Sequence, residues 1–257
     1  SFLAPKIEQV ALAVDTLQVS FTDPGEWQRG FARAVPQAAT WGEALRDLFR
    51  RARRLHPGLE IVVNYALERD SIADLPAFVD QALAEPGLVS ALRLVHPMYL
   101  SPQALAAHRA DLGRFGTDGR FWEGFGAQQD GTDVAALRAA LERVTTDHPS
   151  VVVFPFLDPD ELEPWYTHGD FLPRRYGQLC GAPWTQVHVI PSGDVWVCYD
   201  VVIGNIHADD PEAIWNGERV QALREHVGGQ WLFGGCSGCF LKYSVVEHGT
   251  AEPPGRA

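Results

Sequence analysis

The segment Cys180-Gly-Ala-Pro-Trp-Thr-Gln-Val-His-Val-Ile-Pro-Ser-Gly-Asp-Val-Trp-Val-Cys198 contains two β-rich runs on either side of Pro191-Ser-Gly-Asp194. Apolar residues alternate with polar ones in these runs, and Pro-Ser-Gly-Asp is a strong turn signal. The segment therefore predicts a hairpin, with Cys180 before its first strand and Cys198 at the end of its second. Because antiparallel strands of similar length begin and finish side by side, we expect these two cysteines at the same end of the hairpin.

The other two cysteines form the pair Cys236-Ser-Gly-Cys239. A Cys-x2-Cys pair can place two sulfur atoms on one metal or cluster from a single turn, and Ser237-Gly238 supplies the small, flexible backbone that such a turn needs. The chain has 4 cysteines in all, which is the ligand count of a closed metal site. The expected ligand set is Cys180, Cys198, Cys236 and Cys239.

Three interpretations of these thiols stay open on spacing alone. Disulfides are one, although the cysteines are sparse for 257 residues and we expect no secretory segment. A structural zinc site is the second, although zinc ribbons more often use two short Cys-x2-Cys knuckles. An iron-sulfur cluster held by four thiolates is the third, and it is the one that we favour.

The order of short motifs in this region narrows the choice. In sequence they are Cys180-x12-Gly193-x4-Cys198, Val202-Ile-Gly-Asn-Ile206, Ile214-Trp-Asn216 and Cys236-Ser-Gly-Cys239. Over roughly residues 176 to 241, this order resembles the C-terminal auxiliary-cluster region of radical S-adenosylmethionine enzymes, the SPASM/twitch group. That family has a strand of the form Ile-x-Pro-x-Gly-x-Val-x-x-Cys, followed by a Gly-Asn-Ile turn, an Ile-Trp helix and a Cys-x2-Cys pair. Val189 stands here in the place of the first isoleucine.

The resemblance implies one auxiliary [4Fe-4S] cluster on the four cysteines. Full SPASM domains use seven cysteines for two such clusters, so the chain resembles the shorter twitch type. Members of the family also carry a Cys-x3-Cys-x2-Cys motif near the start of their barrel, and this sequence has none. S-adenosylmethionine and a second [4Fe-4S] cluster are therefore expected with a missing N-terminal half, and the chain alone is expected to be an inactive fragment. A degenerate homologue that has lost radical chemistry is the alternative.

The region before the cysteines alternates strands with helices. Apolar runs predict strands at 17–21, 59–67 and 89–96. Amphipathic patterns predict a helix at 41–56 and a second one that Ser71 caps, with Asp74 as its capping-box-like partner, and that runs to about Glu85. This rhythm predicts a parallel sheet with covering helices.

By the resemblance, these strands correspond to strands four to six of a six-stranded barrel, preceded by a helix at about residues 3 to 14. The expected fold class is α/β: the C-terminal half of a partial (β/α)6 barrel followed by a small twitch-type β-hairpin plus helix cluster domain. The expected domains are residues 1–105 for the barrel half, 106–170 for connecting helices and loop, 171–245 for the cluster domain and 246–257 for a tail.

Two polar residues on the first two strands inherit candidate roles from the resemblance. Ser20 matches the position from which family members contact the ribose of S-adenosylmethionine, and Asn64 matches the position for its methionyl or ribose end. Both side chains are expected near the carboxyl ends of parallel strands, where α/β folds place their ligands. A buried Ser or Asn that the backbone satisfies is the structural alternative.

The connecting region contains two further helix signals and an aromatic loop. Ser101-Pro102 predicts a helix start with a serine cap, and the pattern at 133–146 predicts a second helix. Residues 151–156 predict a short strand. Phe121, Trp122 and Phe125 cluster in the glycine-rich stretch between these helices, where they can line a substrate pocket or anchor an irregular connection.

Composition limits the partners of the protein. The chain has 46% hydrophobic residues, enough for a full core, and a formal net charge of −12 that argues against nucleic-acid binding. No apolar run approaches the length of a membrane span, so no membrane partner is expected. Reduced thiols and a cluster predict a cytoplasmic location. None of the 9 histidines forms a His-x3-His pair, and we expect no histidine ligand.

The function predicted from the resemblance is that of a radical S-adenosylmethionine iron-sulfur enzyme that abstracts hydrogen from its substrate. Because four thiolates saturate the auxiliary cluster, electron transfer or structural support is favoured over substrate binding. An electron accepted there would complete a net oxidation of a peptide or a sugar-like small molecule, with a reductase as electron donor. The alternative is a non-catalytic degenerate barrel with a structural four-cysteine zinc site that acts as a peptide-binding module.

Overall fold

The computed structural model describes residues 6–21, 41–117, 121–122, 131–177, 180–229 and 232–247, and the chain divides into two compact units. Unit 1 comprises residues 1–97 and 131–156, and unit 2 comprises residues 98–130 and 157–257. The chain thus leaves unit 1, returns to it once and leaves it again. The segment that we expected to be a connection, 106–170, contributes to both units, and the predicted domain boundaries remain a prediction.

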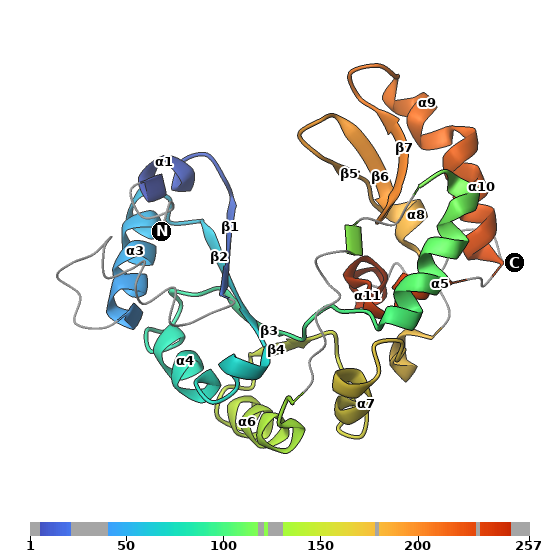
Figure 1. The fold of residues 1–257 in the computed structure, drawn as a ribbon. Helices are drawn as coiled ribbons and strands as arrows, with labels where there is room; N and C mark the ends of the chain where they lie inside the picture. The colour runs from blue at the N-terminus through green and yellow to red at the C-terminus, as the bar shows by residue number, and fades with distance from the viewer. Residues whose placement is uncertain are drawn as a thin grey trace, which may run out of the picture. The chain divides into compact units, whose positions relative to one another are not determined.

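Unit 1 is built on a parallel sheet of four strands in the order β1-β2-β3-β4. Helices lie in a row along one face of this sheet (Figure 1). The α/β class predicted from the sequence is confirmed, and the short strand predicted near residue 151 joins the sheet as its fourth member, beside β3. The elements are α1 (Ile7–Ala11), β1 (Thr16–Phe21), α3 (Trp41–Leu55), β2 (Glu60–Ala66), η2 (Arg69–Ser71), α4 (Leu75–Ala82), β3 (Ala91–Val95), α6 (Val134–Asp147) and β4 (Val152–Phe154).

Alternate burial along the strands explains why the helices cover one face. In β1, Leu17, Val19 and Phe21 are buried while the residues between them are exposed. The ring of Phe78 on α4 packs against Phe21 with ring centroids 5.0 Å apart and against Tyr65 on β2 at 4.3 Å. The apolar face of the sheet and the apolar stripes of the helices therefore form one core layer.

The start of α4 differs from the expected one. We expected Ser71 to cap a helix that began there, but residues 69–71 form a 3-10 turn and the α-helix begins at Leu75. The Ser71 hydroxyl donates to the carbonyl oxygens of Ala66 and Glu68, at 2.7 and 2.9 Å, and Asp74 makes no side-chain cap. Pro76 gives the physical reason, because it lacks a backbone N–H and is tolerated in the first turn of a helix but not in its interior, where a helix begun at residue 71 would place it.

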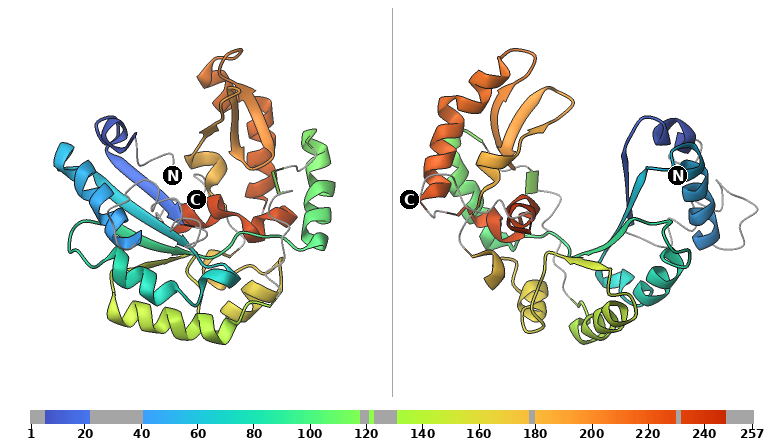
Figure 2. Two further views of the ribbon diagram at one scale, coloured as in Figure 1. Left: turned by 60° about the vertical axis from the view of Figure 1, so that its left-hand side comes forward. Right: turned by 180° about the vertical axis from the view of Figure 1, so that it is seen from behind.

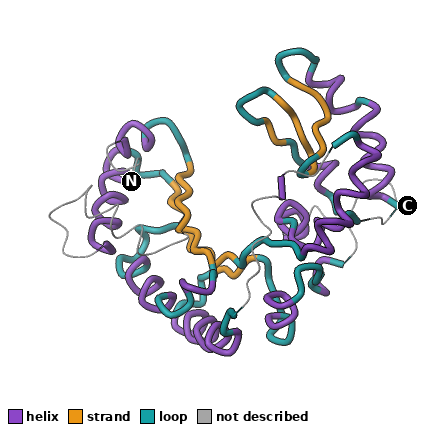
Figure 3. Tube along the Cα trace, viewed as in Figure 1, coloured by secondary structure: helices purple, strands orange, loops and turns teal. Residues whose placement is uncertain are grey.

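Unit 2 combines a three-stranded antiparallel sheet, in the order β5-β6-β7, with short helices (Figures 1 and 3). The helices α9 and α10 follow β7 along the chain, as the turned views also show (Figure 2). The elements are α5 (Pro102–Leu112), η3 (Gly113–Phe115), α7 (Leu162–Thr167), η5 (Arg174–Tyr176), α8 (Ala182–Thr185), β5 (His188–Val189), β6 (Asp194–Cys198), β7 (Val201–Asn205), α9 (Pro211–Asn216), α10 (Glu218–Gly228), η6 (Gly234–Gly238) and α11 (Phe240–Glu247).

The predicted hairpin is confirmed as β5 and β6, and it gains a third strand. Gly204 and Asn205, which the sequence analysis placed in a Gly-Asn-Ile turn, belong to β7, and the turn begins only at Ile206. The predicted Ile-Trp helix is α9, which Asp210 caps by accepting from the backbone N–H groups of Glu212 and Ala213. In the part of the chain that the structure describes, no helix has both the length and the apolar character of a membrane span.

Candidate metal-cluster site

Four elements of unit 2 bring the four cysteines to one region. Cys180 lies just before α8, Cys198 ends β6, Cys236 lies within η6, and Cys239 directly precedes α11. Cys180 and Cys198 both pack against the hydrophobic cluster that contains Cys236, and Cys180 also packs against the neighbouring cluster that contains Cys239. Ligand candidates that lie up to 59 positions apart in the sequence are thus gathered by packing of the hairpin end on η6 and α11.

A tight turn sets the end of the hairpin. Gly193 has φ of 86°, a left-handed conformation that glycine adopts at little cost. Asn205, at the end of β7, donates from its amide to Asp194 Oδ1 at 2.8 Å and to the carbonyl of Ser192 at 3.1 Å. These bonds hold the turn against the third strand, so the opposite end of the sheet, where Cys198 lies, has a defined register.

The thiols lie within electrostatic reach of one another. Burial raises the pKa of Cys198 well above its ordinary value, and the neighbouring Cys236, Cys239 and Cys180 raise it further. Burial likewise raises the pKa of Cys236, and it raises that of Cys239 to about 12, with Cys180 adding to both. All four cysteines are free thiols. The disulfide interpretation therefore does not describe this structure, and any metal bound here must displace thiol protons.

Backbone amides oppose the effect of burial at three of the sulfur atoms. The Cys239 sulfur has hydrogen bonds with the backbone of Leu241 and Lys242 at the start of α11, and both lower its pKa. Backbone hydrogen bonds from Ala182 to Cys180 and from Phe233 to Cys236 act in the same direction. N–H groups aimed at sulfur stabilise the thiolate form, which is the form that binds metal.

Asp200 organises the surroundings two residues after Cys198. Its φ of 68° is the positive value that a non-glycine residue adopts only when its environment enforces it. One carboxylate oxygen accepts from the backbone N–H of Phe121 at 2.6 Å, and the other lies 3.3 Å from Nε2 of the buried His108. Asp200 thus ties the end of the β6–β7 turn to α5 and to the aromatic segment that follows it.

The aromatic residues of the predicted loop anchor the connection. The Phe121 ring stacks on Tyr199 with centroids 4.0 Å apart and an interplanar angle of 7°, and Trp122 is 1% exposed. The sequence allowed these aromatic residues either to line a substrate pocket or to anchor an irregular connection. The contacts of Phe121 and Trp122 support the second interpretation. Phe125 lies outside the described residues.

The donor set fits an iron-sulfur cluster. Four thiols, two of them buried with 8% and 7% exposure, surrounded by apolar side chains and N–H donors, are the ligands and surroundings that such clusters use. Within the described residues, no group of three or more His, Cys, Asp or Glu side chains is arranged so that it could hold a single metal ion.

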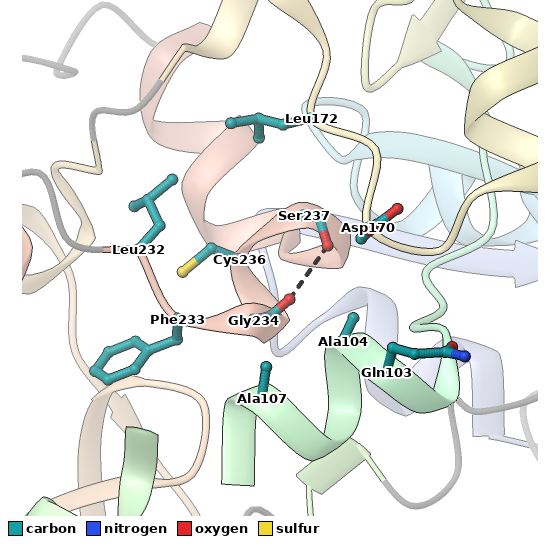
Figure 4. A pocket seen from close by; sticks show the side chains of 10 residues that line it. All are labelled: Gln103, Ala104, Ala107, Asp170, Leu172, Leu232, Phe233, Gly234, Cys236 and Ser237. Carbon is teal, nitrogen blue, oxygen red and sulfur yellow. Dashed lines mark hydrogen bonds between the residues drawn. The ribbon is translucent and has the colours of Figure 1, made fainter. Parts of the chain in front are cut away.

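A cavity of about 410 Å³ opens beside Cys236. Figure 4 shows Leu232 and Phe233 on the side toward which the Cys236 sulfur points, and Gln103 and Asp170 on the opposite side. Ser237 lies between these groups and donates from its hydroxyl to the carbonyl of Gly234 at 3.3 Å. The cavity is therefore apolar beside the candidate ligand, and its other side combines the polar Gln103 and Asp170 with Ala104.

The two candidate residues of unit 1 lie next to each other. Ser20 on β1 and Asn64 on β2 are register partners, and the Asn64 amide donates to the Ser20 hydroxyl at 3.3 Å. Arg93 on β3 is the next register partner of Asn64. Because Ser20 lies on the exposed face of β1, opposite the buried residues of that strand, the three residues form a polar row across the sheet on the face away from the helices.

The fold of unit 2 gathers four free thiols in one region, which makes them a candidate ligand set for a metal cluster. Residues 180–240 match the family model SPASM, described as an iron-sulfur cluster-binding domain. The chain therefore carries a SPASM iron-sulfur cluster-binding domain, as the order of motifs predicted, and the matched residues include all four cysteines. No curated protein and no solved structure matches the chain.

Sequence reasoning missed several residues that shape the two sites. Arg93 could have been found from its place at the centre of a predicted apolar strand, where a charged residue is unusual. Asp200 and His108 gave no signal, since their pairing joins segments 92 positions apart. Lys242 follows Cys239 by three positions and is fully buried, which no sequence pattern indicated.

Proposed function

We propose that this chain is the cluster-bearing part of a radical S-adenosylmethionine enzyme that oxidises a peptide or a sugar-like small molecule. The observation that carries the proposal is the SPASM match over residues 180–240, which contains four free thiols within electrostatic reach of one another. A parallel sheet with helices along one face and a polar row on the other supports it, because α/β enzymes bind ligands near the carboxyl ends of such strands.

The proposed role of the cysteine site is to accept an electron. A [4Fe-4S] cluster, when bound, supplies one-electron transfer. The four thiols would fill its protein ligand positions, so the substrate need not coordinate it. The N–H donors at Cys180, Cys236 and Cys239 favour the thiolates, and the burial of the latter two excludes water. This arrangement suits a site that passes electrons without changing its ligands.

The proposed role of the polar row in unit 1 is to bind S-adenosylmethionine. The hydroxyl of Ser20 and the amide of Asn64 can exchange hydrogen bonds with a ribose, and the guanidinium of Arg93 can bind a carboxylate in two contacts. All 4 cysteines of the chain are used in unit 2. The cluster that activates this cofactor, with its Cys-x3-Cys-x2-Cys ligands, would therefore be supplied by polypeptide beyond these residues, and a reductase would deliver the electrons.

The test uses the enzyme with its Cys-x3-Cys-x2-Cys segment, reduced anaerobically and given S-adenosylmethionine and candidate peptide or sugar substrates. Release of 5′-deoxyadenosine is expected, since it reports hydrogen abstraction by the cofactor-derived radical. Cys236→Ala should still release 5′-deoxyadenosine but lose product formation about 100-fold or more, as expected for loss of a metal ligand. Ser237→Ala, which keeps all ligands, is the matched control. No 5′-deoxyadenosine from the wild type would contradict the enzyme class, and wild-type product formation by Cys236→Ala would contradict the electron role.

A further inference from the structure

Lys242 is the side chain of unit 2 whose placement most needs a physical reason. It lies in α11, three residues after Cys239, and it is 0% exposed. Lysine is almost never fully buried unless it is paired. Removing an ammonium group from water costs roughly several kcal/mol, even after the surrounding protein has relaxed. Its surroundings must therefore offset that cost.

The immediate contacts of the ammonium group are neutral acceptors and aromatic rings. Nζ donates to the carbonyl oxygens of Tyr176 and Gly177, each at 2.9 Å. It also lies over the rings of Tyr243 and Tyr176, at 5.4 and 5.9 Å from their centroids. Burial lowers the pKa of Lys242, and Cys180, Cys236 and Cys239 raise it. Carbonyl oxygens and ring faces also stabilise a cation, so these contacts hold the amine in one position and favour its charged form. None of them neutralises its charge.

The charges that face this cation belong to the candidate cluster ligands. Lys242 acts electrostatically on Cys180, Cys236 and Cys239, and at each of them it favours the negatively charged sulfur. Cys198 is exposed to the opposite influence, because the carboxylate of Asp200 disfavours its negative charge. The buried lysine, three residues after Cys239 in α11, therefore lies within electrostatic reach of three of the four candidate ligands, and Asp200 follows the fourth by two positions.

We propose that Lys242 is a buried counter-charge that raises the reduction potential of the cluster held by the four cysteines. The inference rests on the proposed function of the site. One-electron reduction adds one negative charge to the cluster and its thiolates and breaks no bond, and the electron comes from the reductant. A nearby cation in a medium of low dielectric stabilises the more negative state, and hydrogen bonds and net charge near the sulfur atoms are known determinants of cluster potentials. Lys242 thus makes the cluster a better electron acceptor.

The functional consequence concerns the direction of electron flow. A substrate radical that is to be oxidised must give its electron to a site with a sufficiently high potential. Lys242 supplies that property from the protein without touching substrate, so it is a positioning residue for charge and not a catalytic one. Its effect should appear in the potential of the cluster itself.

The test is a redox titration of the anaerobically reconstituted chain, followed by absorption and electron paramagnetic resonance. Lys242→Met keeps the length of the side chain and removes its charge. We expect the reduction equilibrium to move at least tenfold toward the oxidised cluster, which is a midpoint shift of 59 mV to more negative potential. Lys242→Arg, which keeps the positive charge, should shift the midpoint potential less than Lys242→Met does.

Arg224→Met is the matched control. Arg224 also combines a backbone carbonyl acceptor, that of Pro183 at 2.9 Å, with an aromatic ring, that of Trp215 at 4.5 Å. It does not contribute to the pKa shifts of the four thiols, so its loss should leave the potential unchanged.

The outcomes separate this inference from the proposed function. A wild-type chain that takes up no iron and sulfide would refute the proposed function. A wild-type cluster whose potential is the same in Lys242→Met would overturn the inference alone. Loss of the cluster in Lys242→Met with retention in Lys242→Arg would support it, because the two variants differ in charge. Equal loss of the cluster in Lys242→Met and Lys242→Arg would overturn the inference, because the packing of the lysine side chain and not its charge would then explain why the wild type retains the cluster.

Discussion

At the scale of single residues, the protonation of the thiols in unit 2 is set by opposing effects of their surroundings. The thiols of unit 2 are buried at Cys236 and Cys239 and partly buried at Cys180 and Cys198, and removal from water alone favours their protonated forms. Backbone N–H groups and Lys242 act against that preference at three sulfur atoms, whereas Asp200 reinforces it at Cys198. At Cys180, Cys236 and Cys239 the surroundings therefore favour the thiolate form that the proposed cluster needs.

His96, at the end of β3 in unit 1, is a buried titratable group with no part in the cysteine site. It is 0% exposed, its backbone N–H donates to the carbonyl of Phe154 at 2.8 Å, and burial lowers its pKa to about 3. In the unfolded chain its pKa is about 6.5. The unfolded state therefore binds more protons between these values, so stability is full above pH of about 6.5 and falls as the pH is lowered through that window.

This sign gives a prediction for acid stability. Between pH of about 6.5 and 5, His96 alone should reduce the free energy of unfolding by about 2 kcal/mol. His96→Leu should lose that part of the decrease, and His207→Ala, at an exposed histidine, should keep the wild-type profile. Urea unfolding followed by circular dichroism at several pH values measures the slopes. The same pH dependence in His96→Leu as in the wild type would refute the assignment.

At the scale of elements, the cysteine site depends on the close approach of η6 to α5. A Cβ atom added at Gly234 would collide with the carbonyl oxygen of Ala104 and lie 2.8 Å from the backbone nitrogen of His108. These are backbone atoms of a helix and cannot move aside cheaply. Gly234 therefore permits the contact that places Cys236, two residues later, beside the hairpin.

Gly234→Ala should separate these two elements. We expect it to lower the free energy of unfolding by more than about 2 kcal/mol, as overpacking of a close contact does, and to impair metal uptake. Gly113→Ala is the matched control at the end of the same helix, where the backbone is helical and an added Cβ meets nothing within 4 Å. It should be neutral or stabilise by up to about 1 kcal/mol. Chemical denaturation measures both variants, and equal stability of the two would contradict the proposed contact.

The elements that sequence patterns predicted are those with local causes. The helix α5 begins where Ser101 accepts from the backbone N–H of Ala104 at 3.1 Å, as its cap signal indicated, and α6 begins where its amphipathic pattern does, with Asp133 accepting from Ala136 at 2.9 Å. The hairpin was predicted from its turn residues, and the strands of unit 1 were predicted from their apolar runs. The predicted start of α4 at Ser71 was wrong, because Pro76 lacks a backbone N–H and must lie in the first turn of the helix, although Ser71 is a plausible cap.

Features with causes far apart in the sequence were not predictable. Gly204 and Asn205 extend a strand because they pair with Val195 and Asp194 of β6, and nothing in their own pattern distinguished a strand from a turn. The burial of Lys242 depends on carbonyls 66 and 65 positions away. The four cysteines could be proposed as one ligand set because ligand spacing is a local signal, and that role remains a prediction. The residues around them act through tertiary contacts, which the sequence does not show.

At the scale of the whole molecule, the chain divides its chemistry between two units. Unit 1 carries the polar row of Ser20, Asn64 and Arg93 on a parallel sheet, and unit 2 carries the four thiols, the buried lysine and the cavity beside Cys236. The SPASM match falls entirely within unit 2. The central claim, that this unit holds an iron-sulfur cluster, can therefore be tested on the chain without its cofactor or substrate.

The most direct measurement is the iron, sulfide and zinc content of the chain after anaerobic reconstitution with iron and sulfide, together with its absorption spectrum. We predict about four iron and four sulfide per chain with broad visible absorption, as for a [4Fe-4S] cluster on four thiolates. Ser237→Ala should retain this content, and Cys239→Ser should lose much of it. A colourless protein that contains one zinc per chain and neither iron nor sulfide would contradict the account.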